Sequence, residues 1–289
     1  MHVATISDGN VISVYVKLKE SEKFALNDTE DVVLGSKTAE VTVTGDIMGR
    51  PLDHLDNLLQ LPHGCGEQNM IKLGPVIATI LYFSITGQLT DEISEKAQGL
   101  MEEGYQNELN FRHTDGSYSA FGNKDPSGNS WLTAFVARVY FLAEQYISVN
   151  YTHISECLNW LKSQQQEDGC FKNVGSLIHR ELQGGVDSAT ALTAYITATF
   201  VLIGDPQYDD VINKAKTCLG KCTEPESSTY TKAQCAYTFT LLGDTEKRTQ
   251  LLKQLNTVAI EKDYKGVCCF PSLDIGVPDK WEVYRYSGI

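Results

Sequence analysis

The sequence predicts a mainly α protein, an α/α toroid of helical hairpins preceded by a short β segment. Two stretches near the start are rich in Val, Thr and Ile and partly alternate with polar residues, which is typical of half-buried strands. From about residue 52 to about residue 263, longer segments carry apolar residues at helical spacing. Two short elements recur along those segments, and such recurrence indicates a stacked array of helix pairs.

The predicted strands cover residues 11–18 and 39–47, and a polar stretch at 19–31 joins them. The change of pattern after them divides the chain into two regions. We expect residues 1–46 to form part of a β domain and residues 47–289 to form the helical array.

Apolar spacing predicts helices over residues 68–86, 91–110, 130–148, 155–166, 187–203, 209–219, 229–242 and 247–260. After residue 263 the helical pattern stops, and no helix that could cap the array follows. Because stacked arrays normally end in a polar cap, the toroid is expected to be incomplete at its C-terminus.

The first recurring element is a helix core, WLTAFV at 131–136 and ALTAYI at 191–196, with a looser copy at 231–237. The second is an Asp-Gly turn, DGSY at 115–118 and DGCF at 168–171, whose glycine tolerates a positive φ. Small Ala and Thr faces permit close helix approach, so hairpins are expected to stack and close into a toroid. An ordinary helical bundle is the alternative.

The composition excludes some functions. A net charge of −13 with no basic run makes nucleic acid a poor partner. The apolar stretches near 74–83 and 189–203 fall short of the roughly 18 residues of a membrane span. Eight cysteines and sequons at Asn27 and Asn150 favour an extracellular, glycosylated protein, although the first residues have no secretory signal.

The segment LPHGCGEQNM at 61–70 carries the chemistry. Gly64 and Gly66 flank Cys65, and Gln68 follows three positions later, so a tight backbone can bring the thiol to the glutamine carbonyl. Displacement of ammonia from Gln68 by the thiol would close an internal thioester in a ring of about fifteen atoms. The three residues Gly-Cys-Gly alone favour a tight turn around an inert buried thiol.

A thioester is a stored acyl electrophile, because sulfur donates poorly into the carbonyl and thiolate leaves readily. Water would destroy it, so the site has to stay dry until use. We expect an apolar collar of Leu61, Pro62, Met70, Ile71 and Leu73 to keep it so.

The string at 61–70 resembles the thioester signature of the alpha-2-macroglobulin and complement family. The resemblance extends over 57–60, 110–122, 129–136 and 184–197, and these segments are closer to the macroglobulin branch. It implies that the helical region is the thioester domain and that residues 1–46 belong to a CUB-type β domain. It also places Gly64, Gly66 and Glu67 in the thioester loop.

A second segment, SLIHRELQGG at 176–185, resembles the loop that places a histidine against the thioester in the complement branch. A neutral His179 could attack the acyl group and free the Cys65 thiolate, which then serves as base for an incoming hydroxyl. Glu181 would orient the imidazole. A solvated loop histidine and a surface carboxylate are the alternatives for these two residues. His63 is interpreted as a loop residue, and no metal site is predicted.

Removing Cys65 leaves seven cysteines, an odd number. The resemblance implies a disulfide between Cys170 and Cys218. Residues 157, 222 and 235 are expected to be buried thiols. Adjacent cysteines such as Cys268 and Cys269 rarely bond to each other.

The resemblance implies a broad-spectrum endopeptidase inhibitor whose thioester cross-links a trapped protease by acyl transfer, as one domain of a larger parent protein. Its partner is a target protease or a surface nucleophile, a lysine amine or a hydroxyl. The alternative is a complement-like opsonin that tags surface hydroxyls. Either is a single-use reagent without a cofactor and not an enzyme. A toroidal enzyme would need an Asp-rich or metal-binding set, and Asp209-Asp210 is the only Asp pair.

Overall fold

The computed structural model describes residues 2–7, 10–15, 41–44, 58–179, 183–186 and 188–259. They fall into two compact units, one that contains the strands and one that contains the helices within Asp56–Ala259. The predicted boundary between residues 46 and 47 lies outside the described residues, and so do Asn27, Glu181, Cys268 and Cys269.

The first unit contains an antiparallel sheet with the strand order β2-β1-β3. Its strands are β1 (His2–Ser7), β2 (Asn10–Tyr15) and β3 (Val41–Thr44). Strands β2 and β3 were predicted, whereas β1, which pairs with both of them, was not. A β segment therefore precedes the helices in the chain, and its assignment to a CUB-type domain stays a prediction.

The second unit contains eight α-helices in its described residues, one for each predicted helix. They are α3 (Gly66–Thr86), α4 (Asp91–Glu108), α5 (Ser130–Ala143), α6 (Tyr151–Ser163), α7 (Ala189–Ile203), α8 (Asp209–Leu219), α9 (Thr229–Leu241) and α10 (Thr245–Thr257). Short 3-10 turns lie at η1 (Leu109–Phe111), η2 (Gly122–Lys124), η4 (Pro206–Tyr208) and η5 (Gly220–Thr223). Helix α5 ends five residues before the predicted end. Helix α6 begins four residues before the predicted start, because Asn150 caps it by accepting from the N–H of Thr152 at 3.0 Å.

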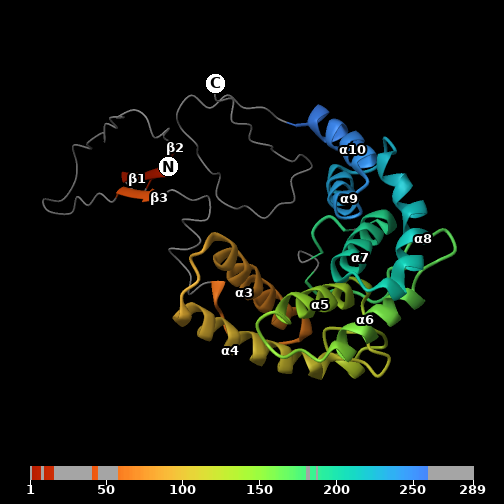
Figure 1. Cartoon of the computed structure of the whole chain (residues 1–289), viewed down its shortest axis with the longest axis horizontal. Coiled ribbons are helices and arrows are strands. Elements are labelled where there is room, and N and C mark those ends of the chain that lie inside the picture. The colour runs from red at the N-terminus through yellow and green to blue at the C-terminus, as the bar shows by residue number, and fades with distance from the viewer. Residues whose placement is uncertain are drawn as a thin grey trace, which may run out of the picture. The chain divides into compact units, whose positions relative to one another are not determined.

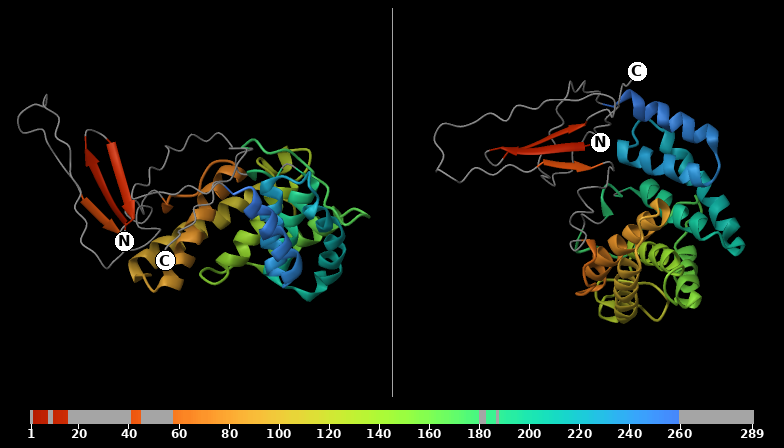
Figure 2. Two further views of the ribbon diagram at one scale, coloured as in Figure 1. Left: turned by 90° about the horizontal axis from the view of Figure 1, so that it is seen from above. Right: turned by 60° about the vertical axis from the view of Figure 1, so that its left-hand side comes forward.

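The helices form two rows. Helices α3, α5, α7 and α9 pack side by side along the inside of a curve, and α4, α6, α8 and α10 each cover the preceding inner helix from outside (Figure 1). In the right view of Figure 2, α9 and α10, in blue, lie side by side as the last described pair. In α7, the ten consecutive residues 191–200 are all buried, as expected of an apolar helix enclosed on every side. The predicted α/α toroid of helical hairpins is confirmed.

The two recurring elements contact each other. In the first copy, the turn residue Tyr118 donates its N–H to Oγ1 of Thr133 in the core of α5, at 3.0 Å. In the second copy, Phe171 donates its N–H to Oγ1 of Thr193 in α7, at 2.9 Å. Each Asp-Gly turn is thereby fixed to the next inner helix, which gives the repeat of the sequence its physical meaning.

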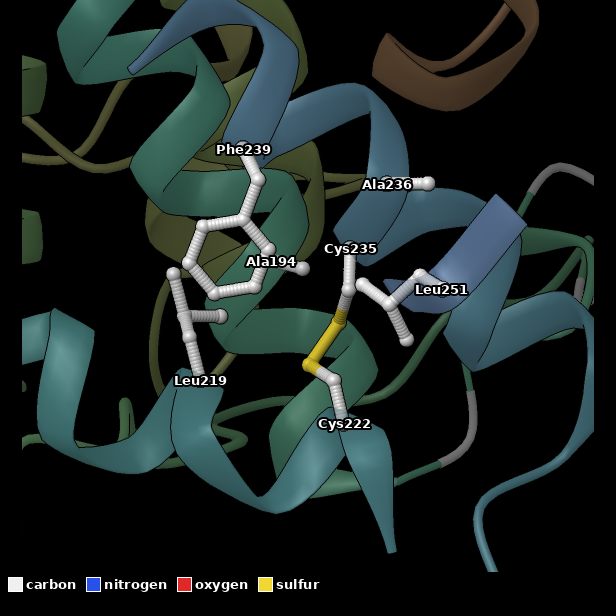
Figure 3. Close-up of a cluster of buried hydrophobic side chains, with 7 residues drawn as sticks. All are labelled: Ala194, Leu219, Cys222, Cys235, Ala236, Phe239 and Leu251. Carbon is white, nitrogen blue, oxygen red and sulfur yellow. A yellow bond between two sulfur atoms is a disulfide. The ribbon is translucent and has the colours of Figure 1, made fainter. Parts of the chain in front are cut away.

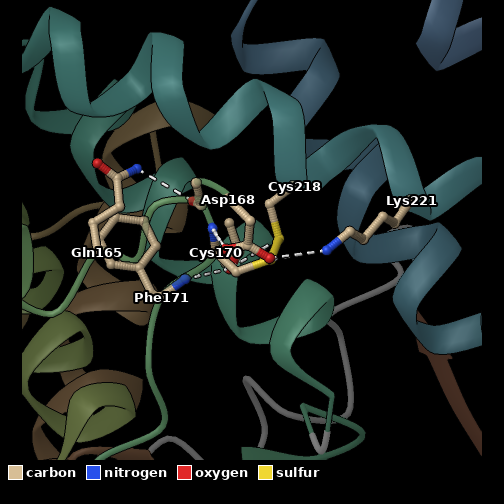
Figure 4. A network of polar contacts seen from close by, with 8 residues as sticks. Gln165, Asp168, Cys170, Phe171, Cys218 and Lys221 are labelled. Carbon is tan, nitrogen blue, oxygen red and sulfur yellow. Dashed lines mark hydrogen bonds and ion pairs between the residues drawn. A yellow bond between two sulfur atoms is a disulfide. The ribbon is translucent and has the colours of Figure 1, made fainter.

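The second turn is reinforced by a disulfide, as the resemblance implies. Cys170 of the turn is bonded to Cys218 of α8, and Lys221 pairs with the turn residue Asp168 at 3.0 Å (Figure 4). The N–H of Cys170 and the ammonium group of Lys221 lower the pKa of Asp168. Gln165 donates to the carbonyl of Val211 at 2.9 Å, so the turn is tied to α8 on both sides.

The expectation of three buried thiols was wrong for two of them. Cys222 in η5 and Cys235 in α9 form a disulfide with Cα atoms 6.3 Å apart. It lies in a buried apolar cluster with Phe239 and Leu251 (Figure 3). The turn at η5 brings the two residues together, and helical spacing alone did not show that turn. Cys157 is a completely buried thiol, as expected.

Helix α3 has 21 residues and, by length and composition alone, is apolar enough to cross a membrane. The predicted stretches were shorter because they excluded its first turns. Within the fold, α3 is a core helix: Leu73, Ile77 and Ile80 are buried where it packs between α4 and α5. Its apolar character is accounted for by this packing.

Candidate functional site

The predicted thioester residues lie at the N-terminus of α3. Cys65 is the N-cap residue with extended backbone angles, and Gln68 occupies the third helical position. The N–H of Cys65 donates to Oε1 of Gln68 at 3.3 Å, while the Cys65 side chain faces the N–H of Gln68, which is the reciprocal arrangement of a capping box. At the start of the helix each of these two side chains is therefore folded back toward the backbone of the other residue.

The two glycines are required for different reasons. Gly64 has a φ of +102°, and a Cβ there would overlap Oε1 of Gln68 and lie 3.0 Å from its Cβ. Gly66 donates its N–H to the carbonyl of Ala120 at 2.9 Å, and a Cβ there would lie 2.8 Å from the carbonyl oxygen of Ser119. Gly64 leaves room for the folded glutamine, and Gly66 lets the 112–121 loop approach the helix start.

Glu67 has a specific role that the sequence did not reveal. Its side chain is completely buried, and its carboxylate accepts the N–H of Ile178 at 2.9 Å and the N–H of His179 at 2.8 Å. The N-terminal turn of a helix is a favourable place for a negative charge. One carboxylate therefore ties the thioester motif to a loop more than a hundred residues away in the sequence.

The backbone of His179 is consequently held at the start of α3, and the placement of its imidazole against the thioester stays a prediction. Its backbone is bonded to Glu67, two residues after Cys65, and the residue is half-buried. Leu177, two residues before it, is buried and anchors the loop. The role of Glu181 as an orienting residue stays a prediction.

The site lies at the surface. Cys65 is half-buried and Gln68 is exposed. The predicted collar is wrong for Met70 and Leu73, which point into the core and are at most 1% exposed, because their helical positions face α4 and α5.

Three large apolar side chains adjoin the site instead. Leu61 lies four residues before Cys65, Phe121 follows Ala120, whose carbonyl accepts the N–H of Gly66, and Ile178 donates its N–H to Glu67. Their exposed fractions are 45%, 48% and 56%, respectively. Of the other collar residues, Pro62 is buried and Ile71 is half-buried. Exposed apolar side chains near the thioester motif therefore come from three separate segments of the chain.

His63 is exposed, as expected for a loop residue, and its Nε2 lies 2.6 Å from Nζ of Lys72 on α3. Among the described residues, no group of three or more His, Cys, Asp or Glu side chains is placed to hold a metal ion. Asp209 and Asp210 are exposed in the first turn of α8, an outer helix.

Asn150 is exposed, so its side-chain nitrogen is accessible while its oxygen caps α6. Its glycosylation stays a prediction.

Comparison with known proteins gives two findings. The family model described as "A-macroglobulin TED domain" matches residues 41–270. Ovostatin from Gallus gallus is 38% identical over 244 residues, which make up 84% of this chain and 17% of ovostatin. The chain therefore spans less than a fifth of the length of this curated relative.

Proposed function

The chain belongs to the alpha-macroglobulin family, whose thioester domain it carries, and from this we propose that it stores an internal Cys65–Gln68 thioester for a single acyl transfer. The bond forms between Sγ of Cys65 and the side-chain carbonyl carbon of Gln68, and ammonia leaves. The capping box carries this proposal, because it folds Gln68 back over Gly64 onto Cys65.

Discharge of the thioester follows from the same geometry. A nucleophile attacks the carbonyl carbon of Gln68, and Cys65 leaves as a thiolate at the positive end of the α3 dipole, where a negative charge is favoured. The acyl group stays on the nucleophile as an ester or an amide. Nothing restores the bond, so the domain acts once as a reagent and not as a turnover catalyst.

We further propose that the parent protein is a protease inhibitor and that the nucleophile is a lysine amine of the trapped enzyme. The similarity to ovostatin supports the macroglobulin branch. The two disulfides among the described residues suit an oxidising compartment, in agreement with a secreted protein. Neighbouring domains of the parent protein would supply the trap.

Intact mass spectrometry of the full chain tests the thioester directly. We expect a mass one ammonia below that calculated from the sequence with two disulfides formed. Methylamine should then add its own mass and release one thiol, because the amine displaces Cys65. Cys65→Ser, which provides no thioester, is the control and should not react. A full calculated mass together with a Cys65 thiol that is free before methylamine is added would contradict the proposal.

The bond between Glu67 and the His179 backbone favours a second candidate function, the transfer of the acyl group to surface hydroxyls. The His179 imidazole would attack the carbonyl carbon, and the freed Cys65 thiolate would take the proton of the incoming hydroxyl. Direct attack by an amine needs no such base.

The two functions are separated by transfer to glycerol and to a lysine-like amine. In the second function, His179→Ala lowers the rate of transfer to glycerol by about 10²-fold or more, the usual contribution of general acid–base and nucleophilic groups, and leaves amine transfer unchanged. His63→Ala, an exposed histidine next to the motif, is the matched control. Equal rates of glycerol transfer in wild type and His179→Ala would eliminate the hydroxyl-transfer function.

A further inference from the structure

Glu108 lies at the end of α4 and is completely buried. Its Oε2 accepts a hydrogen bond from Nδ2 of Asn69 at 2.8 Å. Asn69 directly follows Gln68 in the first turn of α3, so the buried acid contacts the residue next to the thioester carbonyl.

Asn69 is held on every side by the end of α4. Besides Glu108, its Nδ2 donates to the carbonyl of Gly104 at 2.8 Å, and its Oδ1 accepts from Asn107 at 2.9 Å. Its backbone N–H donates to the carbonyl of Cys65 at 2.8 Å. A displacement of Asn69 would therefore be transmitted to the turn that contains Cys65 and Gln68.

The surroundings of Glu108 provide no charge to balance a carboxylate. Arg112 pairs with Glu156 of α6. Within the described part of the chain, Oε1 of Glu108 has no hydrogen-bond partner, nor do the hydroxyls of Tyr118 and Tyr140. Burial raises the pKa of Glu108 well above its ordinary value, because the ionised form would be isolated in the core.

Burial favours the uncharged forms of four other titratable groups around this core. Burial raises the pKa values of Tyr118, of Tyr140 on α5 and of Cys157 on α6, all far above neutrality. Tyr105 of α4 bonds to Nδ1 of His153, and burial lowers the pKa of that histidine. Apart from the Arg112–Glu156 pair, Glu108 is the group of this cluster that can become negative as the pH rises.

We propose that Glu108 acts as a neutral carboxylic acid that positions Asn69, and thereby holds the first turn of α3 in the conformation in which Gln68 faces Cys65. This role rests on the proposed thioester function. Ionisation of Glu108 would favour opening of the α3–α4 contact, so that water can reach the carboxylate, and would release Asn69. The buried acid would make the fraction of molecules in which Gln68 faces Cys65 dependent on pH.

The test compares wild type with Glu108→Gln, which keeps a neutral acceptor of the same shape, and Glu108→Leu, which keeps the size and removes the acceptor. Glu103→Gln, an exposed position on α4, is the matched control. Hydrogen exchange of residues 65–70 is followed from about pH 6 to about pH 9, and the methylamine-reactive fraction is measured in parallel. At each pH, the amide exchange rate of each protein is divided by that of Glu108→Gln. This ratio cancels the pH dependence of the chemical exchange step itself.

We expect the wild-type ratio to rise about tenfold over this range. The closed form binds the Glu108 proton more tightly than the open form does, so a higher pH favours the open form. Glu108→Leu should exchange fast at every pH and contain little reactive thioester. The wild-type pH profile is decisive even if Glu108→Leu does not fold. A flat wild-type ratio, or a Glu108→Gln variant as unprotected as Glu108→Leu, would overturn the proposal. The expected exchange ratios without any methylamine-reactive species would instead contradict the thioester function and leave the positioning of Asn69 supported.

Discussion

Replacing Gly64 with alanine is expected to reduce thioester formation by about 100-fold or more while the helices stay intact. The φ of +102° disfavours any side chain there, at about 1–3 kcal/mol. The new Cβ would also overlap Oε1 of Gln68 and lie 3.2 Å from the carbon that Cys65 attacks, so the glutamine has to move away. A combined cost above about 3 kcal/mol corresponds to the stated loss.

The methylamine-reactive fraction measures this effect, and circular dichroism checks the helices. Gly99→Ala is the matched control, since an added Cβ in that part of α4 meets no atom within 4 Å. It should keep the thioester and gain about 0.5–1 kcal/mol of helix stability. A Gly64→Ala protein with the reactive fraction of wild type would show that Gln68 does not need the room left by this glycine.

Glu67→Ala is expected to release the loop that carries His179. The substitution removes the acceptor of two part-buried backbone N–H groups, and hydrogen bonds to a charged group contribute about 1.5–3 kcal/mol each. Loss of both corresponds to about 10²-fold or more in the population of the open loop. Hydrogen exchange of the Ile178 and His179 amides should increase accordingly, with a smaller increase in Glu67→Gln, which keeps one neutral acceptor.

A double-mutant cycle shows whether the loop acts through its histidine. If it does, Glu67→Ala lowers the rate of glycerol transfer per intact thioester. The double variant Glu67→Ala/His179→Ala then has the same rate as His179→Ala alone. Additive losses in the double variant would mean that Glu67 supports the thioester itself and not His179. Both rates are normalised to the methylamine-reactive fraction, which separates loss of the bond from loss of its discharge.

The helical architecture was predictable because apolar periodicity and capping residues are local signals. The positions of all eight helices followed from spacing, and errors were confined to ends such as that of α6, where the cap at Asn150 decides. Strand β1 was not predicted, although it has the length of β2 and alternates as β2 does.

The contacts that complete the site could not be read from the sequence. Glu67 reaches the backbone of residues 178 and 179, and a partner that is a backbone N–H leaves no trace in residue types. The acid at position 108 looks like any other carboxylate at the end of a polar helix until its burial is known. Similarly, the Cys222–Cys235 pairing depends on the turn at η5, which contains Cys222.

The capping box also has a consequence for the protein after it has reacted. Closure of the thioester removes the amide nitrogen of Gln68 but keeps the oxygen that receives the Cys65 N–H. Hydrolysis then turns position 68 into a glutamate, the residue that capping boxes prefer at the third helical position, where its charge is also favoured by the helix. The hydrolysed domain would therefore have a better-formed beginning of α3 than the fresh one, and hydrolysis should leave this end of the fold at least as stable as before.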